Sequence, residues 1–229
     1  MKNRYNVSFK EQFVRKELES FLDNMEFTPV RTLDESIIKD SGLFPRYDIY
    51  SGNDYISANY KNRYFVQSDI HLQEIYETTD TDSDGDTITR TKYKTIFQGR
   101  FMVFDYDTIS NESVYIYDKR SRHVTGDLIQ TELDAFNKRF DITAKDATAA
   151  LRILTPQVIE GIALASDKLA CPISLSFVND KIYIAVSNGD AFEAATVGDA
   201  TLSEQREQVK REIQAVLDMT ETIYLKNKK

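Results

Sequence analysis

The chain has 229 residues and an acidic composition, with 29 lysines and arginines against 37 aspartates and glutamates and a formal net charge of −8. This length can bury a hydrophobic core without disulfides or structural metals, and the charge disfavours nucleic acid as a partner because a phosphate backbone would be repelled. The single cysteine excludes an intramolecular disulfide and a thiolate metal cluster. No apolar run approaches the roughly 18 residues that span a bilayer, so the chain as given is expected to be soluble.

The N-terminal part of the chain has helical periodicity. Apolar residues between positions 8 and 25 recur at spacings of three and four, which predicts an amphipathic helix docked on a core. Pro29 helps to close this helix. The capping pattern at residues 32–35 (TLDE) then predicts a second, short helix that runs to about Gly42.

After Pro45 the pattern changes to the two-residue alternation of β-strands. Residues 47–60 are predicted to form two short strands about a turn at residues 51–54, and residues 63–77 a third strand. Because no helix signal intervenes, these strands and those that follow are expected to pair antiparallel. The following strands are predicted at residues 88–97, 99–106 and 113–118.

Helix signals return in the second half of the chain. Short helices are predicted over residues 128–140, over residues 144–153, and after Thr155, where Pro156 suits a first helical position. Residues 172–187 then have the pattern of a β-hairpin with a two-residue turn at Asn179 and Asp180.

The last predicted element is an amphipathic helix that begins at residues 201–204 (TLSE), and its apolar stripe requires another surface to cover it. No linker or internal repeat divides the chain. We therefore expect one α+β domain over residues 1–229. Its mostly antiparallel sheet should have about seven to nine strands, covered by N-terminal, central and C-terminal amphipathic helices.

The acidic stretch at residues 80–87 (DTDSDGDT) resembles the start of a calcium-binding loop. Its first, third and fifth residues are aspartates and its sixth is glycine, as in a helix-loop-helix site. Position 12 of that motif requires glutamate but is Thr91 here, and the flanks look like strands where the motif needs helices. We interpret the stretch as a solvated turn. Candidate ligands for a weakly bound divalent ion remain Asp80, Asp82, Asp84 and Asp86.

No catalytic motif stands out elsewhere in the sequence. It lacks a Gly-x-Ser-x-Gly elbow, a Walker loop, a dinucleotide-binding glycine pattern after a strand, and a His-Glu-x-x-His motif. The two histidines, His71 and His123, are too few for a three-histidine metal site and are expected at the surface. Cys171 is interpreted as a small buried hydrophobe. We predict no catalytic residue and no cofactor.

Two features leave a binding role open. The short basic cluster at Lys119, Arg120 and Arg122 is interpreted as solvated surface, with a phosphate or lipid head-group role as the alternative. The 13 tyrosines and 13 phenylalanines are interpreted as core and cross-strand pairs. The alternative is that those of the strand-rich middle section line a binding groove.

Several motifs match the pattern of one bacterial family. They are VSFKEQFV at residues 7–14, the S-x-L-F of residues 41–44, the D-Y-I of residues 54–56, SDIH at residues 68–71, IFQGRF at residues 96–101, and DAFNKRFDITAKDATAALRILTP at residues 134–156. On these motifs the chain resembles the bacterial domain-of-unknown-function family 3137. Members often carry a pair of transmembrane helices ahead of this domain. The chain is then either a natural soluble variant or the part that follows such a membrane segment, and in the second case the resemblance implies a membrane tether upstream of Met1 and a location on the cytoplasmic side of a bacterial membrane. The family has no established activity to transfer.

Three hypotheses about function follow from these observations. The preferred one is a non-enzymatic module near the cytoplasmic face of the membrane, whose sheet presents a groove or edge to a protein partner that is not yet identified. The second is a domain that binds a small molecule or lipid against the aromatic-rich sheet. The third is a divalent-metal-dependent enzyme that uses the candidate aspartates.

Overall fold

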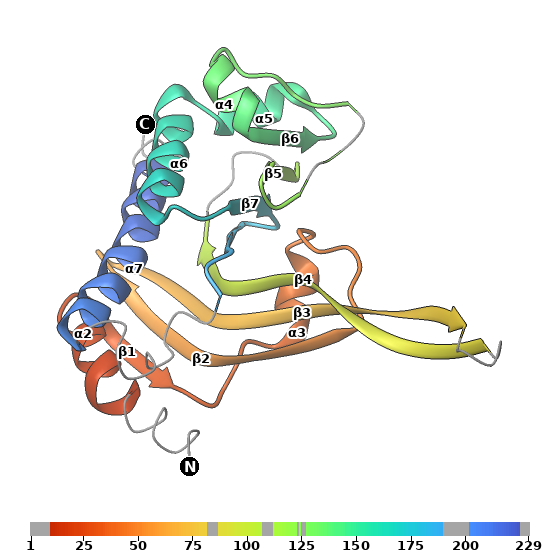
Figure 1. Cartoon of the computed structure of the whole chain (residues 1–229). Coiled ribbons are helices and arrows are strands. Elements are labelled where there is room, and N and C mark those ends of the chain that lie inside the picture. The colour runs from red at the N-terminus through yellow and green to blue at the C-terminus, as the bar shows by residue number, and fades with distance from the viewer. Residues whose placement is uncertain are drawn as a thin grey trace.

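An eight-stranded antiparallel sheet organises the residues that the computed structural model describes, which are 10–81, 87–106, 112–122, 124, 127–189 and 202–224. Its strands are β1 (Asp23–Thr28), β2 (Ile49–Tyr60), β3 (Arg63–Thr81), β4 (Thr87–Asp105), β5 (Val114–Asp118), β6 (Phe140–Ala144), β7 (Ile173–Val178) and β8 (Lys181–Val186). Their order in the sheet is β1-β2-β3-β4-β8-β7-β5-β6 (Figure 1). The predicted α+β class, with a mostly antiparallel sheet, is confirmed.

The helices fall at the two chain ends and in the centre, as predicted. They are a π-helical turn η1 (Lys10–Val14) and the α-helices α2 (Arg15–Glu19), α3 (Glu35–Asp40), α4 (Asp134–Arg139), α5 (Ala147–Ile153), α6 (Pro156–Leu169) and α7 (Leu202–Tyr224). The side chains of Asp34 and Asp146 accept hydrogen bonds from the backbone N–H groups of Ser36 and Thr148, and so cap α3 and α5.

Hydrophobic residues cover both faces of the sheet. On one face, α2, α6 and α7 contribute buried side chains such as Leu18, Ile162 and Leu217, and α6 lies beside α7 (Figure 1). On the other face, α3 and the segment after it contribute Ile38 and Leu43. Because both faces of its centre are buried, the sheet carries apolar side chains at consecutive positions, as at residues 101–104 (FMVF) of β4, all four of which are buried.

Two strands continue where the sequence predicted breaks. Residues 47–60 were expected to form two strands, but β2 is one strand with a bulge between Asn53 and Ile56, where Asp54 has a φ of 57°. Likewise β4 runs unbroken through Gly99. Turn-forming residues here bend a strand instead of ending it, because neighbours on both sides maintain the pairing.

Other boundaries differ from the prediction because long-range pairing overrides local periodicity. The first helix ends at Glu19, and β1 follows as an edge strand on β2. The helix predicted over residues 128–140 is reduced to α4, and the missed strand β6 pairs with β5. The predicted final helix and the hairpin are confirmed; the hairpin turn residues Asn179 and Asp180 have φ angles of 49° and 56°. Helix α6, expected to be short, has 14 residues.

The outer halves of β3 and β4 form a two-stranded projection, which we call the β3–β4 arm (residues 74–81 and 87–94). It extends well beyond the rest of the sheet (Figure 1). Pairing between β2 and β3 ends at Gln73, and β8 meets β4 only from Arg100 onward. Within the described residues, the arm is therefore stabilised by pairing between its own two strands, from Glu74 opposite Lys94 to Thr81 opposite Thr87.

Candidate functional site

A cleft opens at the base of the β3–β4 arm, on the face of the sheet that carries α3. We call it the arm-base cleft, and its volume is about 390 Å³. Residues 43–46 after α3 form one wall, β3 and β4 at the start of the arm form another, and parts of β5, β7 and β8 complete it. Segments from most of the chain length therefore meet here.

Aromatic rings line the inner part of this cleft. Phe44, Phe97 and Tyr117, which we call the aromatic floor, all line the cavity. The ring centroid of Phe44 lies 4.8 Å from that of Phe97, which is itself buried. Burial raises the pKa of the Tyr117 hydroxyl despite the opposing effect of nearby Arg122, so this side chain is neutral at physiological pH. The floor offers an uncharged surface for an apolar group.

Three cations lie at the edge of the cleft, and we call Arg46, Lys94 and Arg122 the rim cations. Among the described lining residues the one acid is Glu74, whose carboxylate lies 3.8 Å from the Lys94 ammonium. In the described part of the chain, no ion pair joins Arg46 or Arg122 to a carboxylate. The rim is thus locally positive on a protein with a net charge of −8.

Arg122 is held in place by two contacts. Its Nη1 donates a hydrogen bond of 2.8 Å to the carbonyl oxygen of Leu43, and its guanidinium carbon lies 4.8 Å from the centre of the Tyr117 ring. These contacts connect the segment after α3 with the end of β5. They also fix the guanidinium over the aromatic floor.

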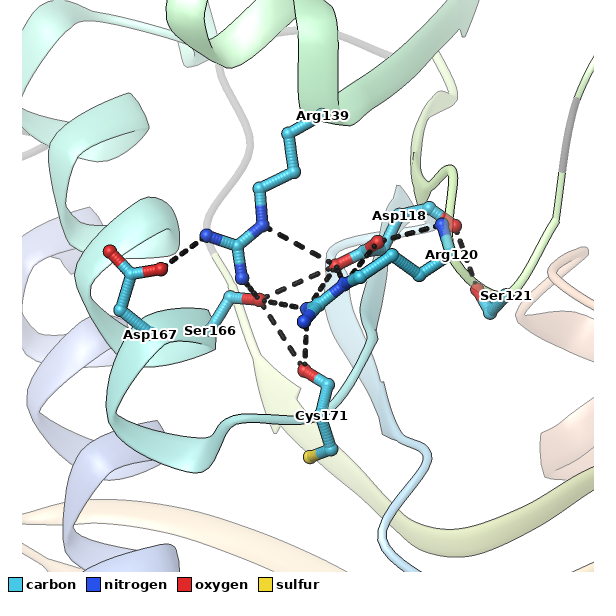
Figure 2. A network of polar contacts seen from close by, with 7 residues as sticks. All are labelled: Asp118, Arg120, Ser121, Arg139, Ser166, Asp167 and Cys171. Atoms are coloured by element: carbon cyan, nitrogen blue, oxygen red, sulfur yellow. Dashed lines mark hydrogen bonds and ion pairs between the residues drawn. The ribbon is translucent and has the colours of Figure 1, made fainter.

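The turn that carries Arg122 is organised by a buried carboxylate. Asp118, at the end of β5, has a fully buried side chain whose oxygens accept hydrogen bonds from the backbone N–H and the guanidinium of Arg120, the shortest at 2.7 Å (Figure 2). The Asp118 carbonyl oxygen accepts from the backbone N–H groups of Ser121 and Arg122 at 2.9 and 3.1 Å. One residue therefore shapes the whole turn.

The same carboxylate connects this turn to α6 and to Arg139 at the end of α4. Arg139 lies 3.7 Å from Asp118 and also contacts Ser166 and Asp167 of α6, while Arg120 donates to the carbonyl oxygen of Cys171 (Figure 2). Burial opposes ionisation of Asp118, but the hydrogen bonds and charges of the two arginines outweigh it and hold the pKa of the carboxyl below its usual value.

The basic cluster noted in the sequence is thus divided between structural and exposed roles. Lys119 forms an ion pair of 3.2 Å with the buried Asp141, and Arg120 is bound by Asp118. Lys119 is therefore only partly solvated, at 28% exposed, whereas Arg120 keeps 44% of its side chain exposed although Asp118 binds it. Arg122 alone reaches the cleft. Periodicity gave no sign of this division, because it depends on the geometry of a single turn.

Only one of the four candidate metal ligands lies within the described residues. Asp80 is exposed near the end of β3, opposite Ile88, whereas Asp82, Asp84 and Asp86 lie outside the described residues. The stretch joins two antiparallel strands, so the helices that a helix-loop-helix calcium site needs are replaced by strands on both sides. Among the residues that the structure describes, no cluster of three or more potential metal ligands occurs.

The remaining candidates do not converge on a reactive centre. A ring nitrogen of His71 lies 2.9 Å from the hydroxyl of Thr95, and His123 lies outside the described residues. Cys171 is half-buried, and burial raises the pKa of its thiol to about 11. A neutral thiol is a poor nucleophile.

Sequence reasoning did not anticipate the buried charges under η1 and α7. The ammonium of Lys10 lies 2.7 Å from the carboxylate of Asp54, and both side chains are almost completely buried. Arg100, also buried, lies 3.7 Å from Asp69 and from Glu212. An arginine inside the apolar run of β4 was the only local sign.

The arm offers a second surface. Arg90, Lys92 and Lys94 alternate along β4 and so lie on one face of the arm. On the opposite face, Ile75 and Tyr93 form an exposed cross-strand pair. In the described ranges, no other strand pairs with either edge of the arm.

Comparison with known proteins gives a family and a fold. Residues 95–225 match the family described as Protein of unknown function (DUF3137), and no curated protein matches the chain. Among solved structures, the crystal structure of the mycobacterial trehalose monomycolate transport factor A, TtfA, is similar with a TM-score of 0.51 and 9% sequence identity. The match covers 95% of this chain and 96% of that one, and at this identity it shows the fold alone. Among the described helices, none is both long and apolar enough to cross a membrane.

Proposed function

The chain belongs to the DUF3137 family, whose function is unknown, and we propose that it is a non-enzymatic binding module that holds a small molecule in the arm-base cleft. The observation that carries this proposal is the combination of an aromatic floor with polar groups at the rim. The volume of about 390 Å³ falls in the usual range for ligand pockets. Such a mixture of many apolar contacts and a few polar ones provides affinity and orientation without any chemical step.

The structural neighbour gives this proposal some support. That protein is a mycobacterial trehalose monomycolate transport factor. A shared fold does not transfer a ligand. It does make a lipid-like ligand a reasonable class to test in a cleft that has both an apolar floor and a polar rim.

Native mass spectrometry of freshly purified protein tests the proposal. Ser174 lines the cleft from β7, so Ser174→Leu should partly fill the cavity and expel a ligand that the wild-type protein retains. Ser20→Leu is the matched control, because Ser20 is exposed and lies after α2, outside the cleft. Equal retention by the two variants would place any ligand elsewhere. A wild-type protein that retains no ligand and binds no member of a small-molecule panel would refute the proposal.

A second candidate function is protein binding through the β3–β4 arm. Strand edges without a neighbour can accept an added strand from another protein. The cations at Arg90, Lys92 and Lys94 disfavour pairing between identical arms by repulsion, and favour a partner segment with acidic side chains. In this form, the hypothesis of a protein-interaction module assigns the binding surface to the exposed strand edges of the β3–β4 arm.

Replacing residues 75–93 with a two-residue Asn-Gly turn tests the second candidate. The arm side chains are largely exposed, so the body should keep its thermal stability. A partner recovered with the wild-type protein should be lost with this variant and with a double variant that replaces Arg90 and Lys92 by glutamate, neither of which lines the cleft. Retention of that partner by both variants would refute binding through the arm.

We also propose that the protein acts at the cytoplasmic face of a bacterial membrane. The support is the membrane anchor that the family resemblance implies. Fractionation of the native gene product, with protease added to intact and permeabilised cells, tests this location. Recovery of the protein in the soluble fraction, or protease cleavage in intact cells, would contradict it.

A further inference from the structure

We infer that the ligand of the arm-base cleft is a single-chain anionic amphiphile, with its head group among the rim cations and its chain on the aromatic floor. This inference rests on the proposed binding function and specifies its ligand class. It is carried by the charge at the rim, the fixed position of Arg122 and the size of the cavity.

The charge of the head group follows from the composition of the rim. Lys94 shares the nearby carboxylate of Glu74, whereas Arg46 and Arg122 form no ion pair within the described ranges. A negative head group would supply the missing partner through charge-assisted hydrogen bonds. Because the protein as a whole carries a net charge of −8, this cationic site is not a consequence of a generally basic surface.

The position of Arg122 favours a planar or tetrahedral oxyanion. One N–H of its guanidinium donates to the Leu43 carbonyl oxygen, and a guanidinium has five N–H donors in a fixed fork. Donors therefore remain for a carboxylate or phosphate oxygen. The contact with Tyr117 already restricts the guanidinium, so binding costs less side-chain entropy than at a freely rotating arginine.

The cavity limits the apolar part of the ligand to one chain. Its volume of about 390 Å³ lies near the lower end of the range for drug-sized ligands. The aromatic floor gives a continuous apolar surface between the segment after α3 and β4, where the ring centroids of Phe44 and Phe97 are 4.8 Å apart. A single alkyl chain can lie on this surface, whereas the two chains of a diacyl lipid would exceed the cavity.

Calorimetric titration with a defined panel tests the inference. The panel is octanoate, decanoate, dodecanoate, dodecyl phosphate, dodecanol and dodecyltrimethylammonium, each below its critical micelle concentration. We expect dodecanoate and dodecyl phosphate to bind at least tenfold more tightly than dodecanol, and the ammonium amphiphile to bind most weakly. From octanoate to dodecanoate, affinity should rise by up to about fourfold per methylene as each is buried.

Two charge-reversal variants provide the matched comparison. Arg46→Glu should weaken dodecanoate binding at least tenfold and reduce the preference for anions over the ammonium amphiphile. Arg152→Glu makes the same change on the exposed side of α5, outside the cleft, and should leave both values unchanged. Since both arginines are exposed, both variants should fold, which circular dichroism can verify.

Different results would separate the inference from the proposed function. Equal affinity for dodecanoate, dodecanol and dodecyltrimethylammonium would overturn the inferred head-group charge, and equal effects of the two charge reversals would overturn the role of the rim. If the wild-type protein retains a neutral ligand that Ser174→Leu expels, the binding function stands and the inference fails. If the wild-type protein retains no ligand and binds no panel compound, both the proposed function and the inferred ligand class fail.

Discussion

Replacing Asp118 with asparagine should destabilise the protein by about 2–3 kcal/mol. The change keeps the size of the side chain but removes its negative charge. That charge strengthens the hydrogen bonds that the carboxylate oxygens accept from the Arg120 backbone N–H and guanidinium, and it attracts Arg139. A completely buried ion pair would cost about 3–5 kcal/mol to break. The two arginine side chains are 44% and 24% exposed, so water can solvate them in the variant and the cost should be smaller.

The pH dependence of this effect has a defined sign. The pKa of the Asp118 carboxyl is lower in the folded protein than in the unfolded chain. Its contribution to the free energy of unfolding is therefore complete above the unfolded pKa of about 4 and is lost as the pH falls through the folded value. The wild-type protein and Asp118→Asn should consequently differ by a constant amount above about pH 5 and converge below about pH 4.

Equilibrium urea denaturation followed by circular dichroism measures this difference, with the exposed Asp127→Asn as the control. A loss at pH 7 of less than about 0.5 kcal/mol, which is typical of ordinary surface substitutions, would refute the reasoning. In a double-mutant cycle with Arg120→Met, the two changes should be strongly non-additive. Additive effects would show that the hydrogen bonds to Arg120 are not the source of the stability.

Three further changes are predicted. Gly99→Ala should lower the free energy of unfolding by at least about 2 kcal/mol in urea titrations. The new Cβ would lie 2.1 Å from the Val186 carbonyl oxygen, and the alanine would have to adopt a φ of 153°. A variant as stable as the wild-type protein would contradict this close approach. Lys10→Met should cost about 3 kcal/mol in the same assay, since it removes the ammonium that lies 2.7 Å from the buried Asp54 carboxylate, and a change near zero would argue against η1 docking through this pair. Cys171 should react with Ellman's reagent at pH 8 at least tenfold more slowly than a free thiol, because its pKa is raised to about 11; a fast reaction would mean that the thiol is far more exposed.

Elements encoded by local signals were predictable from the sequence. The hairpin of β7 and β8 has alternating apolar residues on both sides of a two-residue turn, and the capping pattern at residues 32–35 predicted α3, although its cap is Asp34 and not the first residue of that pattern. In each case the physical cause acts within a few residues. Such local signals specify the element independently of the contacts that it makes elsewhere in the fold.

Features decided by distant partners were not predictable in the same way. Residues 141–143 lie between two predicted helices and carried no strand prediction, but pairing with β5 makes residues 140–144 the strand β6. The bulge at Asp54 depends on β3 and the Lys10 ammonium, and Arg122 reaches the cleft only because Asp118 shapes its turn. The arm-base cleft itself combines segments that no local pattern relates.

The pairing of β4 with β8 has a consequence for synthesis on the ribosome. Residues 100–105 of β4 find their neighbours at 181–186, after the intervening strands and helices have been translated. The nascent first half must therefore present an open strand edge until β8 emerges, and such edges attract other chains. We expect translation that stalls before β8 to yield an aggregation-prone intermediate that depends on chaperones, whereas the released full-length chain closes this edge itself.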